Sequence, residues 1–301
     1  METCCILYNP KAGNGRGLNE ARRLDSIWSG KSLDYIDVTT IADIRAYLDS
    51  LPAETTVVLA GGDGTLNHFI NDMGGEAPAR DIYYFAAGSG NDFLRDAERT
   101  RDDPPFLLNP YLQNLPTVTV NGMTRYFLNG IGYGIDGYCC EVGDKQRLKS
   151  GKPVNYTAIA IKGLLFGYHR TLADVCVDGD TKAYRAVWLA PTMKGRFYGG
   201  GMMCAPGQNR LDPEGSVSTM VMTGKSKLKT LIVFPSIFKG GHIRHREMVT
   251  IRPGHEVTVR FNRPTALQID GETVLGVTEY SVSTRKSVGA AEKSEAAVVA
   301  E

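Results

Sequence analysis

The chain has 301 residues, of which 42% are hydrophobic and 22% charged, and this is typical of a globular protein large enough for two domains. Its 34 basic and 33 acidic residues leave a formal net charge of +1, so the overall balance does not predict a nucleic-acid partner. No apolar run reaches the roughly 20 residues of a membrane-spanning helix, the start does not resemble a secretory signal, and the six cysteines form no Cys-x-x-Cys pair. We therefore expect a reduced, cytoplasmic protein.

The first third of the chain alternates between strand-like and helix-like segments. Apolar runs predict strands at residues 4–9, 33–39, 56–60 and 82–87, and the segments between them predict helices at 18–28, 41–51 and 66–73. Thr40 or Asp43 is placed to cap the second of these helices. Such repetition predicts a parallel sheet covered on both faces, with ligands at the carboxyl ends of the strands. We assign residues 1–122 to this nucleotide-binding α/β domain.

The pattern changes after Pro104-Pro105. Asn121-Gly122 predicts a hairpin, and two helices are expected near residues 138–148 and 155–166. Many short alternating runs follow, and they predict a mainly antiparallel β-sandwich. We assign residues 123–285 to this β-rich domain and expect residues 286–301 to form a disordered tail, since they have little to bury.

Three glycine-containing loops follow three of the predicted strands. Glycine lets a ligand approach the backbone closely, and the second loop opens a helix whose free amides favour a phosphate. Asp63 adds a carboxylate that can hold Mg2+ against that phosphate, or can simply cap the helix. Asn91 and Asp92 can equally be helix caps. The loops are Asn9-Pro10-Lys11-Ala12-Gly13, Gly61-Gly62-Asp63-Gly64-Thr65 and Gly88-Ser89-Gly90-Asn91-Asp92.

The ordered set of these motifs resembles the diacylglycerol kinase catalytic-domain family, which includes soluble bacterial lipid kinases and the sphingosine kinases. Gly-Gly-Asp-Gly-Thr alone is shared with NAD kinases and, loosely, with phosphofructokinases. The resemblance runs from about Tyr8 to Glu272. It is carried by Asn9-Pro10-x-x-Gly13, Gly61-Gly62-Asp63-Gly64-Thr65-x-Asn67, Gly88-Ser89-Gly90-Asn91-Asp92-Phe93, the glycine-rich residues 198–215 and Asp270-Gly271-Glu272.

The resemblance implies a lipid kinase that uses ATP and Mg2+, with an NAD kinase/phosphofructokinase-like α/β domain and the nucleotide in the cleft between the two domains. Glu272 matches the glutamate assigned as general base, which takes the proton of the acceptor hydroxyl. Asp63 would organise Mg2+ and the phosphates. The implied nucleotide contacts are Asn9, Pro10, Lys11, Ala12, Gly13, Thr39 or its neighbour Thr40, Gly61, Gly62, Asp63, Gly64, Thr65, Asn67, Gly88, Ser89 and Asn91.

The lipid side of the site is marked by Asp136, which stands where related kinases have a carboxylate proposed to hold the lipid head group. Asp136 can equally cap the helix that follows it. Asp92 is a second candidate for contact with the substrate. From these matches we expect transfer of the γ-phosphate to the hydroxyl of diacylglycerol or a similar lipid, as part of phospholipid metabolism.

The chain departs from the family in two places. His68 stands where the family usually has glutamate, and a neutral histidine does not replace the charge of a carboxylate. The Leu-Asp-Asp-Gly turn, which holds a structural Mg2+ in some members, here has one inserted residue and a proline. Asp212 and Glu214 are the candidate ligands at this turn, beside Asp63 in the phosphate loop.

One segment has a large local excess of positive charge. Residues 225–263 contain nine Lys or Arg against Glu247 and Glu256, and the first half of this segment also holds several large apolar residues. This composition suits contact with an anionic membrane surface, and it also suits a half-buried helix with exposed lysines. We expect peripheral membrane association and no nucleic-acid partner, and a homodimer is left open. The competing functions are an NAD kinase-like enzyme and a nucleotide- or lipid-binding regulator without turnover.

Overall fold

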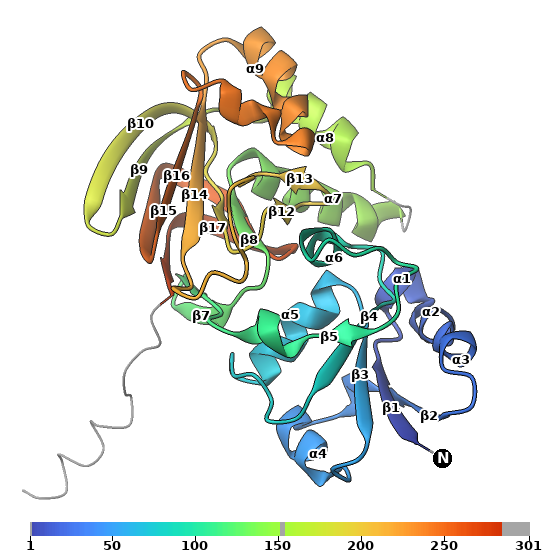
Figure 1. Cartoon of the computed structure of the whole chain (residues 1–301). Coiled ribbons are helices and arrows are strands. Elements are labelled where there is room, and N and C mark those ends of the chain that lie inside the picture. Colours follow the sequence, from blue (N-terminus) through green and yellow to red (C-terminus); the bar gives the residue numbers. More distant parts are fainter. Residues whose placement is uncertain (1, 151–153, 285–301) are drawn as a thin grey trace, which may run out of the picture.

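The computed structural model describes residues 2–150 and 154–284 (Figure 1). Two domains follow one another along the chain, each built on its own sheet. The predicted tail, residues 286–301, lies outside the described residues.

A five-stranded sheet forms the first domain. Its strand order is β2-β1-β3-β4-β5, and all neighbours run parallel except β5, which is antiparallel to β4. The strands are nearly continuous apolar runs because both faces of a parallel sheet are buried. They are β1 (Thr3–Tyr8), β2 (Ser32–Asp37), β3 (Thr56–Gly61), β4 (Ile82–Ala86) and β5 (Phe106–Leu107).

Helices cover both faces of this sheet. Ile6 packs in the core that includes α2 and α3, whereas its neighbour Leu7 packs in the core that includes α4 and α5. Of the two predicted caps for α4, the structure uses Asp43, whose carboxylate accepts a hydrogen bond from the Ala46 amide at 2.9 Å. The helices are α1 (Ala12–Gly15), α2 (Gly17–Ala21), α3 (Leu24–Ile27), η1 (Val38–Thr40), α4 (Ile44–Ser50), α5 (Asp63–Asp72), α6 (Asp92–Asp96) and η2 (Asn109–Leu112).

A ten-stranded, mainly antiparallel sheet forms the second domain. Its order is β7-β6-β17-β16-β8-β11-β14-β10-β9, with β15 paired to β14. Because β16 also pairs with β9, the strands from β16 to β9 close into a ring around an apolar core. The strands are β6 (Thr117–Val120), β7 (Met123–Tyr126), β8 (Gly130–Tyr133), β9 (Thr171–Val177), β10 (Asp180–Leu189), β11 (Thr192–Met193), β14 (Val217–Thr223), β15 (Val249–Gly254), β16 (Glu256–Ile269) and β17 (Glu272–Ser283), beside the separate pair β12 (Phe197–Tyr198) and β13 (Met202–Met203).

Helices of the second domain gather at the end of this sheet. In Figure 1, α8 and α9 lie at the top and the first domain at the bottom, with α7 between them. No helix within the two described ranges is long and apolar enough to cross a membrane. The helices are α7 (Ile135–Ser150), α8 (Tyr156–Lys162), η3 (Gly163–Gly167), α9 (Lys227–Val233), η4 (Phe234–Lys239) and η5 (Gly241–Arg244).

The predicted fold class is confirmed, with local differences. The hairpin at Asn121-Gly122 is present, but both of its strands belong to the second sheet, since β6 pairs with β17. The predicted boundary at residue 122 therefore falls inside the second sheet. The helix expected over residues 18–28 is divided into α2 and α3 around Arg23, whose guanidinium donates to the Ala86 and Arg101 carbonyls.

Candidate active site

The three glycine loops lie at one edge of the first sheet. Asn9 follows β1, Gly61 ends β3 and Gly88 lies two residues beyond the end of β4. These strands are parallel, so their carboxyl ends meet at the same edge. Thr39 follows β2 at this edge too, and its amide and hydroxyl both donate to Asp37 Oδ1.

The loops contact one another directly. Asn9 Nδ2 donates to Thr65 Oγ1 at 3.1 Å, which joins the first loop to the second. A Cβ added to Gly88 would lie 2.3 Å from Gly62 Cα, so the second and third loops touch backbone to backbone. Any side chain at Gly88 would push these loops apart. Glycine is therefore required here for the assembly of the edge as well as for access of a ligand.

Asp63 is the residue that joins the second loop to the third. It lies in the first turn of α5, where Gly62 is the N-cap residue, so Asp63 does not cap its own helix. Its two carboxylate oxygens instead accept hydrogen bonds from the backbone amides of Asp92 and Phe93, each at 3.0 Å. The amides at the start of α5 have no partners within the helix and remain suited to an anion.

Asp92 links this edge to the second domain. Its Oδ2 accepts a hydrogen bond from the Gly200 amide at 2.8 Å, in the glycine-rich turn between β12 and β13. The residue is 6% exposed, and burial, together with the negative charge of Asp63, raises the pKa of Asp92 to about 6. A proton can therefore be held or released here near neutral pH.

The Asp270-Gly271 turn holds Glu272 against the first domain. Both turn residues have positive φ, +46° and +95°, as a two-residue hairpin between β16 and β17 requires. The Asp270 carboxylate accepts from the amides of residues 128, 129 and 130 and, at 2.8 Å, from Asn67 Nδ2 of α5. Burial raises the pKa of Asp270, and these hydrogen bonds act in the opposite direction.

Glu272 makes two contacts with basic side chains. Its Oε2 is 2.5 Å from Arg125 Nη1, and Arg125 Nη2 donates to Asn67 Oδ1 at 2.7 Å. Its Oε1 is 3.5 Å from His68 Nε2. Asn67 and His68 lie on α5, the helix that begins with the phosphate loop. The predicted base and the predicted phosphate loop are thus connected through one short helix.

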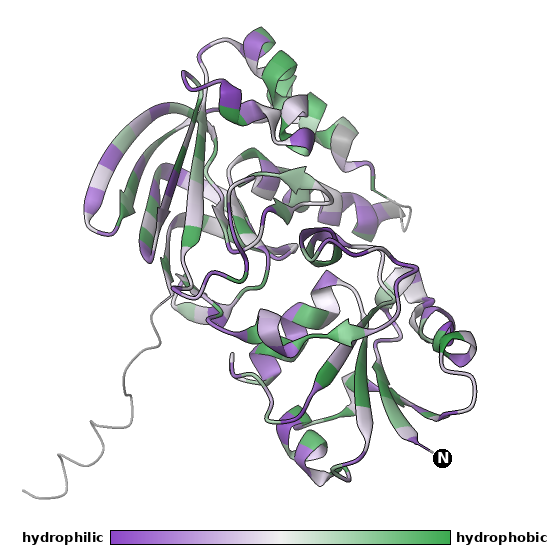
Figure 2. Ribbon diagram, viewed as in Figure 1, coloured by the Kyte–Doolittle hydropathy of each residue, from purple (hydrophilic) through white to green (hydrophobic). Residues whose placement is uncertain are grey.

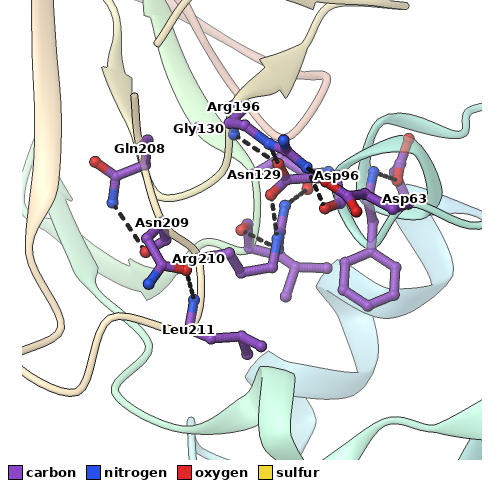
Figure 3. A network of polar contacts seen from close by, with 12 residues as sticks. Asp63, Asp96, Asn129, Gly130, Arg196, Gln208, Asn209, Arg210 and Leu211 are labelled. Atoms are coloured by element: carbon purple, nitrogen blue, oxygen red, sulfur yellow. Dashed lines mark hydrogen bonds and ion pairs between the residues drawn. The ribbon is translucent and has the colours of Figure 1, made fainter. Parts of the chain in front are cut away.

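A buried ion-pair network holds the two domains together (Figure 3). Asp96 of α6 accepts from Arg196 Nε at 2.7 Å and from Arg210 Nε at 2.5 Å, and its side chain is 1% exposed. Arg210 also donates to the Leu128 carbonyl and to Asn129 Oδ1. Both aspartates of α6 are therefore bonded to the second domain.

Two further ionisable groups are buried in the second domain. Asp136 is 7% exposed, and burial raises its pKa to about 6, although the Tyr198 hydroxyl and Gln268 amide nearby partly oppose this. Neither of its oxygens has a hydrogen-bond partner of normal geometry among the described residues. Lys194 is 1% exposed, and burial and the charge of Arg210 lower its pKa to about 8. The Lys194 ammonium likewise has no such partner.

The candidate metal ligands do not form a preassembled cage. Asp212 accepts from the Glu214 amide and from the amide and hydroxyl of Ser216, and Ser216 and the Lys194 charge contribute to lowering its pKa. Within residues 2–150 and 154–284, no group of three or more His, Cys, Asp or Glu side chains could hold a metal ion. Mg2+ commonly binds through one or two carboxylates plus phosphates and water, and Asp63 fits that mode of binding.

The predicted site residues fall into three groups. Asn67 and Glu272 are bridged by Arg125 between the domains, and Asp136, Asp212 and Glu214 lie within the second domain. Sequence reasoning missed Arg125, Asp96 and Arg210, which no local motif marks. The remaining predicted residues lie at the carboxyl edge of the first sheet: Asn9, Pro10, Lys11, Ala12, Gly13, Thr39, Gly61, Gly62, Asp63, Gly64, Thr65, Gly88, Ser89, Asn91 and Asp92.

Family profiles match both domains. Residues 3–120 match the diacylglycerol kinase catalytic domain, and residues 129–285 match the YegS C-terminal NAD kinase beta sandwich-like domain. The chain belongs to the diacylglycerol kinase family. This places it among the lipid kinases, and the order of the two matches agrees with the two domains of the structure.

Individual diacylglycerol kinases resemble the chain over most of its length. One from Mycobacterium tuberculosis is 24% identical over 257 residues, which cover 82% of this chain and 81% of that protein. The crystal structure of a diacylglycerol kinase from Bacillus anthracis is 17% identical and superposes with a TM-score of 0.61, covering 94% of this chain and 93% of the other. At this identity the structural likeness shows the fold alone.

Proposed function

We propose that the protein transfers the γ-phosphate of MgATP to the hydroxyl of diacylglycerol or a similar lipid. The observation that carries the proposal is the connection of Glu272 to α5 through Arg125, Asn67 and His68. His68 is five residues after Asp63, which is about 7 Å along a helix. The Glu272 carboxylate therefore contacts the helix whose first turn is the proposed phosphate site.

The proposed reaction needs few groups. The Glu272 carboxylate accepts the proton of the lipid hydroxyl while the hydroxyl oxygen bonds to the γ-phosphorus. The bond from the γ-phosphorus to the oxygen that bridges to the β-phosphate breaks, and ADP leaves. The amides at the start of α5 and the three loops would hold the phosphates. Mg2+, held by Asp63 and the nucleotide, would supply neutralisation of phosphate charge. Most of the rate enhancement would come from alignment and electrostatics.

Asp136 and Asp92 are the proposed contacts of the lipid head group. Both adjoin the β12–β13 hairpin, since Asp92 bonds to Gly200 and Asp136 lies close to Tyr198. The buried Asp136 carboxylate lacks a hydrogen-bond partner of normal geometry among the described residues. A lipid hydroxyl would supply the missing donor.

The proposal is tested by following radiolabel from γ-labelled ATP into diacylglycerol in mixed micelles, with NAD present as a rival acceptor. We expect labelled phosphatidate from the wild type and a loss of about 100-fold or more in rate for Glu272→Gln. Glu279→Gln is the matched control, because Glu279 is also on β17 and pairs with Arg260; its rate should stay within about twofold.

Three other results would overturn the proposal in different ways. Label in NADP would identify an NAD kinase-like enzyme. Label in neither acceptor, with nucleotide binding retained, would identify a regulator without turnover. A fully active Glu272→Gln variant would keep the substrate but exclude the proposed base.

A further inference from the structure

The helices α8 and α9 lie at the end of the second domain (Figure 1), and Figure 2 shows hydrophobic residues along both of them. Leu228 and Ile232 of α9 are 69% and 70% exposed, and Phe166 of η3 is 78% exposed. Leu228 and Ile232 are four residues apart, so they lie on the same side of the helix. Thr230 and Val233, on the other side, are buried.

The exposed residues of α8, η3 and α9 belong to one continuous surface. Lys227 at the start of α9 donates to the Leu165 carbonyl of η3 at 2.7 Å, and η3 continues directly from α8. α9 and η3 are in tertiary contact. We define the α8–α9 surface by its exposed apolar residues, which are Ile161, Phe166, Leu228 and Ile232.

The segments that form the α8–α9 surface also contain lysines. Residues 225–239 contain four lysines and residues 156–167 contain one, and neither segment contains Asp or Glu. Glu247 pairs with Lys229 at 2.9 Å. Lys162, Lys225 and Lys239 are exposed. Exposed apolar side chains and lysines in the same segments, without carboxylates there, complement a bilayer with an apolar interior and negatively charged head groups.

We propose that the α8–α9 surface docks on an anionic lipid bilayer. Its apolar side chains enter the region between head groups and acyl chains, and the lysines contact anionic head groups. The occupant is a bilayer because the lysines and apolar residues occur together on one helix, as in interfacial helices. The inference deepens the proposed function, in which the acceptor is a membrane lipid, but docking itself does not depend on turnover.

A cavity lies beside this surface. It has a volume of about 240 Å³ and is lined by Gly167, directly after Phe166, and by Tyr138 of α7. Leu275 and Gly276 line it as well, and they follow Glu272 on β17 by three and four residues. The cavity therefore adjoins both the α8–α9 surface and the strand that carries Glu272.

Docking is tested by co-sedimentation of the full chain with vesicles of phosphatidylcholine alone or with 30% phosphatidylglycerol. We expect binding to the anionic vesicles that weakens with added salt, and a loss of about tenfold or more in partitioning for Leu228→Ser with Ile232→Ser. Leu172→Ser is the matched control, because Leu172 is 50% exposed on β9 and lies outside both segments. It should bind like the wild type.

Equal binding of the Leu228→Ser/Ile232→Ser variant and the wild type would overturn the proposal, as would equal binding to both vesicle types. So would a wild-type dimer in sedimentation velocity that the double variant converts to monomer, since the surface would then be covered by a second copy. A kinase assay separates the two proposals. Docking without lipid phosphorylation would overturn only the proposed function, whereas activity lost on vesicles but kept on a soluble short-chain diacylglycerol supports both.

Discussion

His68 Nε2 lies 3.5 Å from Glu272 Oε1, although the two residues come from different domains. The other oxygen of Glu272 is held by Arg125, so both oxygens face nitrogen-bearing side chains. The resembling kinases usually carry glutamate at the position of His68, which would set two carboxylates side by side. In this chain the candidate base lies instead between two nitrogen-bearing side chains, one from each domain.

The first prediction follows from this contact. His68→Glu places a second carboxylate beside Glu272, and their repulsion favours protonation of the pair. We expect the acidic limb of the rate profile to move to higher pH, so that the loss of kcat is larger at pH 6 than at pH 8. The measurement is kcat for lipid phosphorylation across this range.

A matched control is available for that substitution. His245 also lies beside a glutamate, 3.6 Å from Glu247, outside the candidate site. His245→Glu makes the same chemical change and should leave the profile where it is. If His68→Glu and His245→Glu gave the same profile, the contact with Glu272 would have no role in proton transfer.

The fold could be predicted because its signals are local. Continuous apolar runs alternating with helical segments predict a parallel sheet, and Asn121-Gly122 predicts a tight hairpin. The divided helix around Arg23 and the five-residue α6 were not predicted. Tertiary contacts of Arg23 accompany the division of the first helix, and α6 is too short to show a helical period.

The candidate site could be predicted only in part, because only some of its signals are local. Glycines at strand ends mark the phosphate loops, and these motifs stand in the sequence itself. The partners of Asp96 and Glu272 are not marked by any motif, because Arg210 is 114 residues from Asp96 and Arg125 is 147 residues from Glu272. Complementary charges that far apart leave no spacing pattern, so only the three-dimensional fold brings them together.

The second prediction concerns the network between the domains. Asp96→Ala leaves the buried Arg210 without its carboxylate partner, and we expect a loss of about 3–5 kcal/mol in the free energy of unfolding. Glu98→Ala is the control, because Glu98 also pairs with Arg196 but its side chain is 78% exposed; it should change stability by less than about 0.5 kcal/mol. Urea denaturation measures both. Similar losses for the two variants would show that the buried Asp96 carboxylate contributes no more to stability than the exposed Glu98 carboxylate.

The third prediction uses the buried Lys194. Its pKa of about 8 lies below the usual 10.5, so the unfolded chain binds the proton more tightly between these values. The cost of burying the charge is full below pH 8 and disappears above pH 10.5. Lys194→Met removes that cost and should stabilise the protein at pH 7 by on the order of 3 kcal/mol.

The Lys194→Met gain should shrink as pH rises from 8 to 10, which thermal unfolding at a series of pH values can follow. Lys182→Met, at a side chain 55% exposed on β10, should show no such trend. A gain that stays constant with pH would assign the effect to packing instead of charge.

The fourth prediction separates stability from function at Asp136. Burial raises its pKa to about 6, above the usual 3.8, so the folded state binds the proton more tightly between these values and stability falls as pH rises through them. The cost is full above pH 6 and absent below pH 3.8. Asp136→Asn should therefore be more stable than the wild type at pH 7, by on the order of 3 kcal/mol, and equal to it near pH 4.

The same Asp136→Asn variant should phosphorylate diacylglycerol more slowly, with the loss mainly in KM for the lipid and not for ATP, because the proposed contact is with the head group. Asp49→Asn, at an exposed position of α4, should change neither stability nor KM. A variant that is stabilised yet keeps the wild-type KM would show that the buried carboxylate does not contact the lipid. One that is destabilised at pH 7 would show that Asp136 has a partner when it is ionised, and would remove the reason for expecting a ligand there.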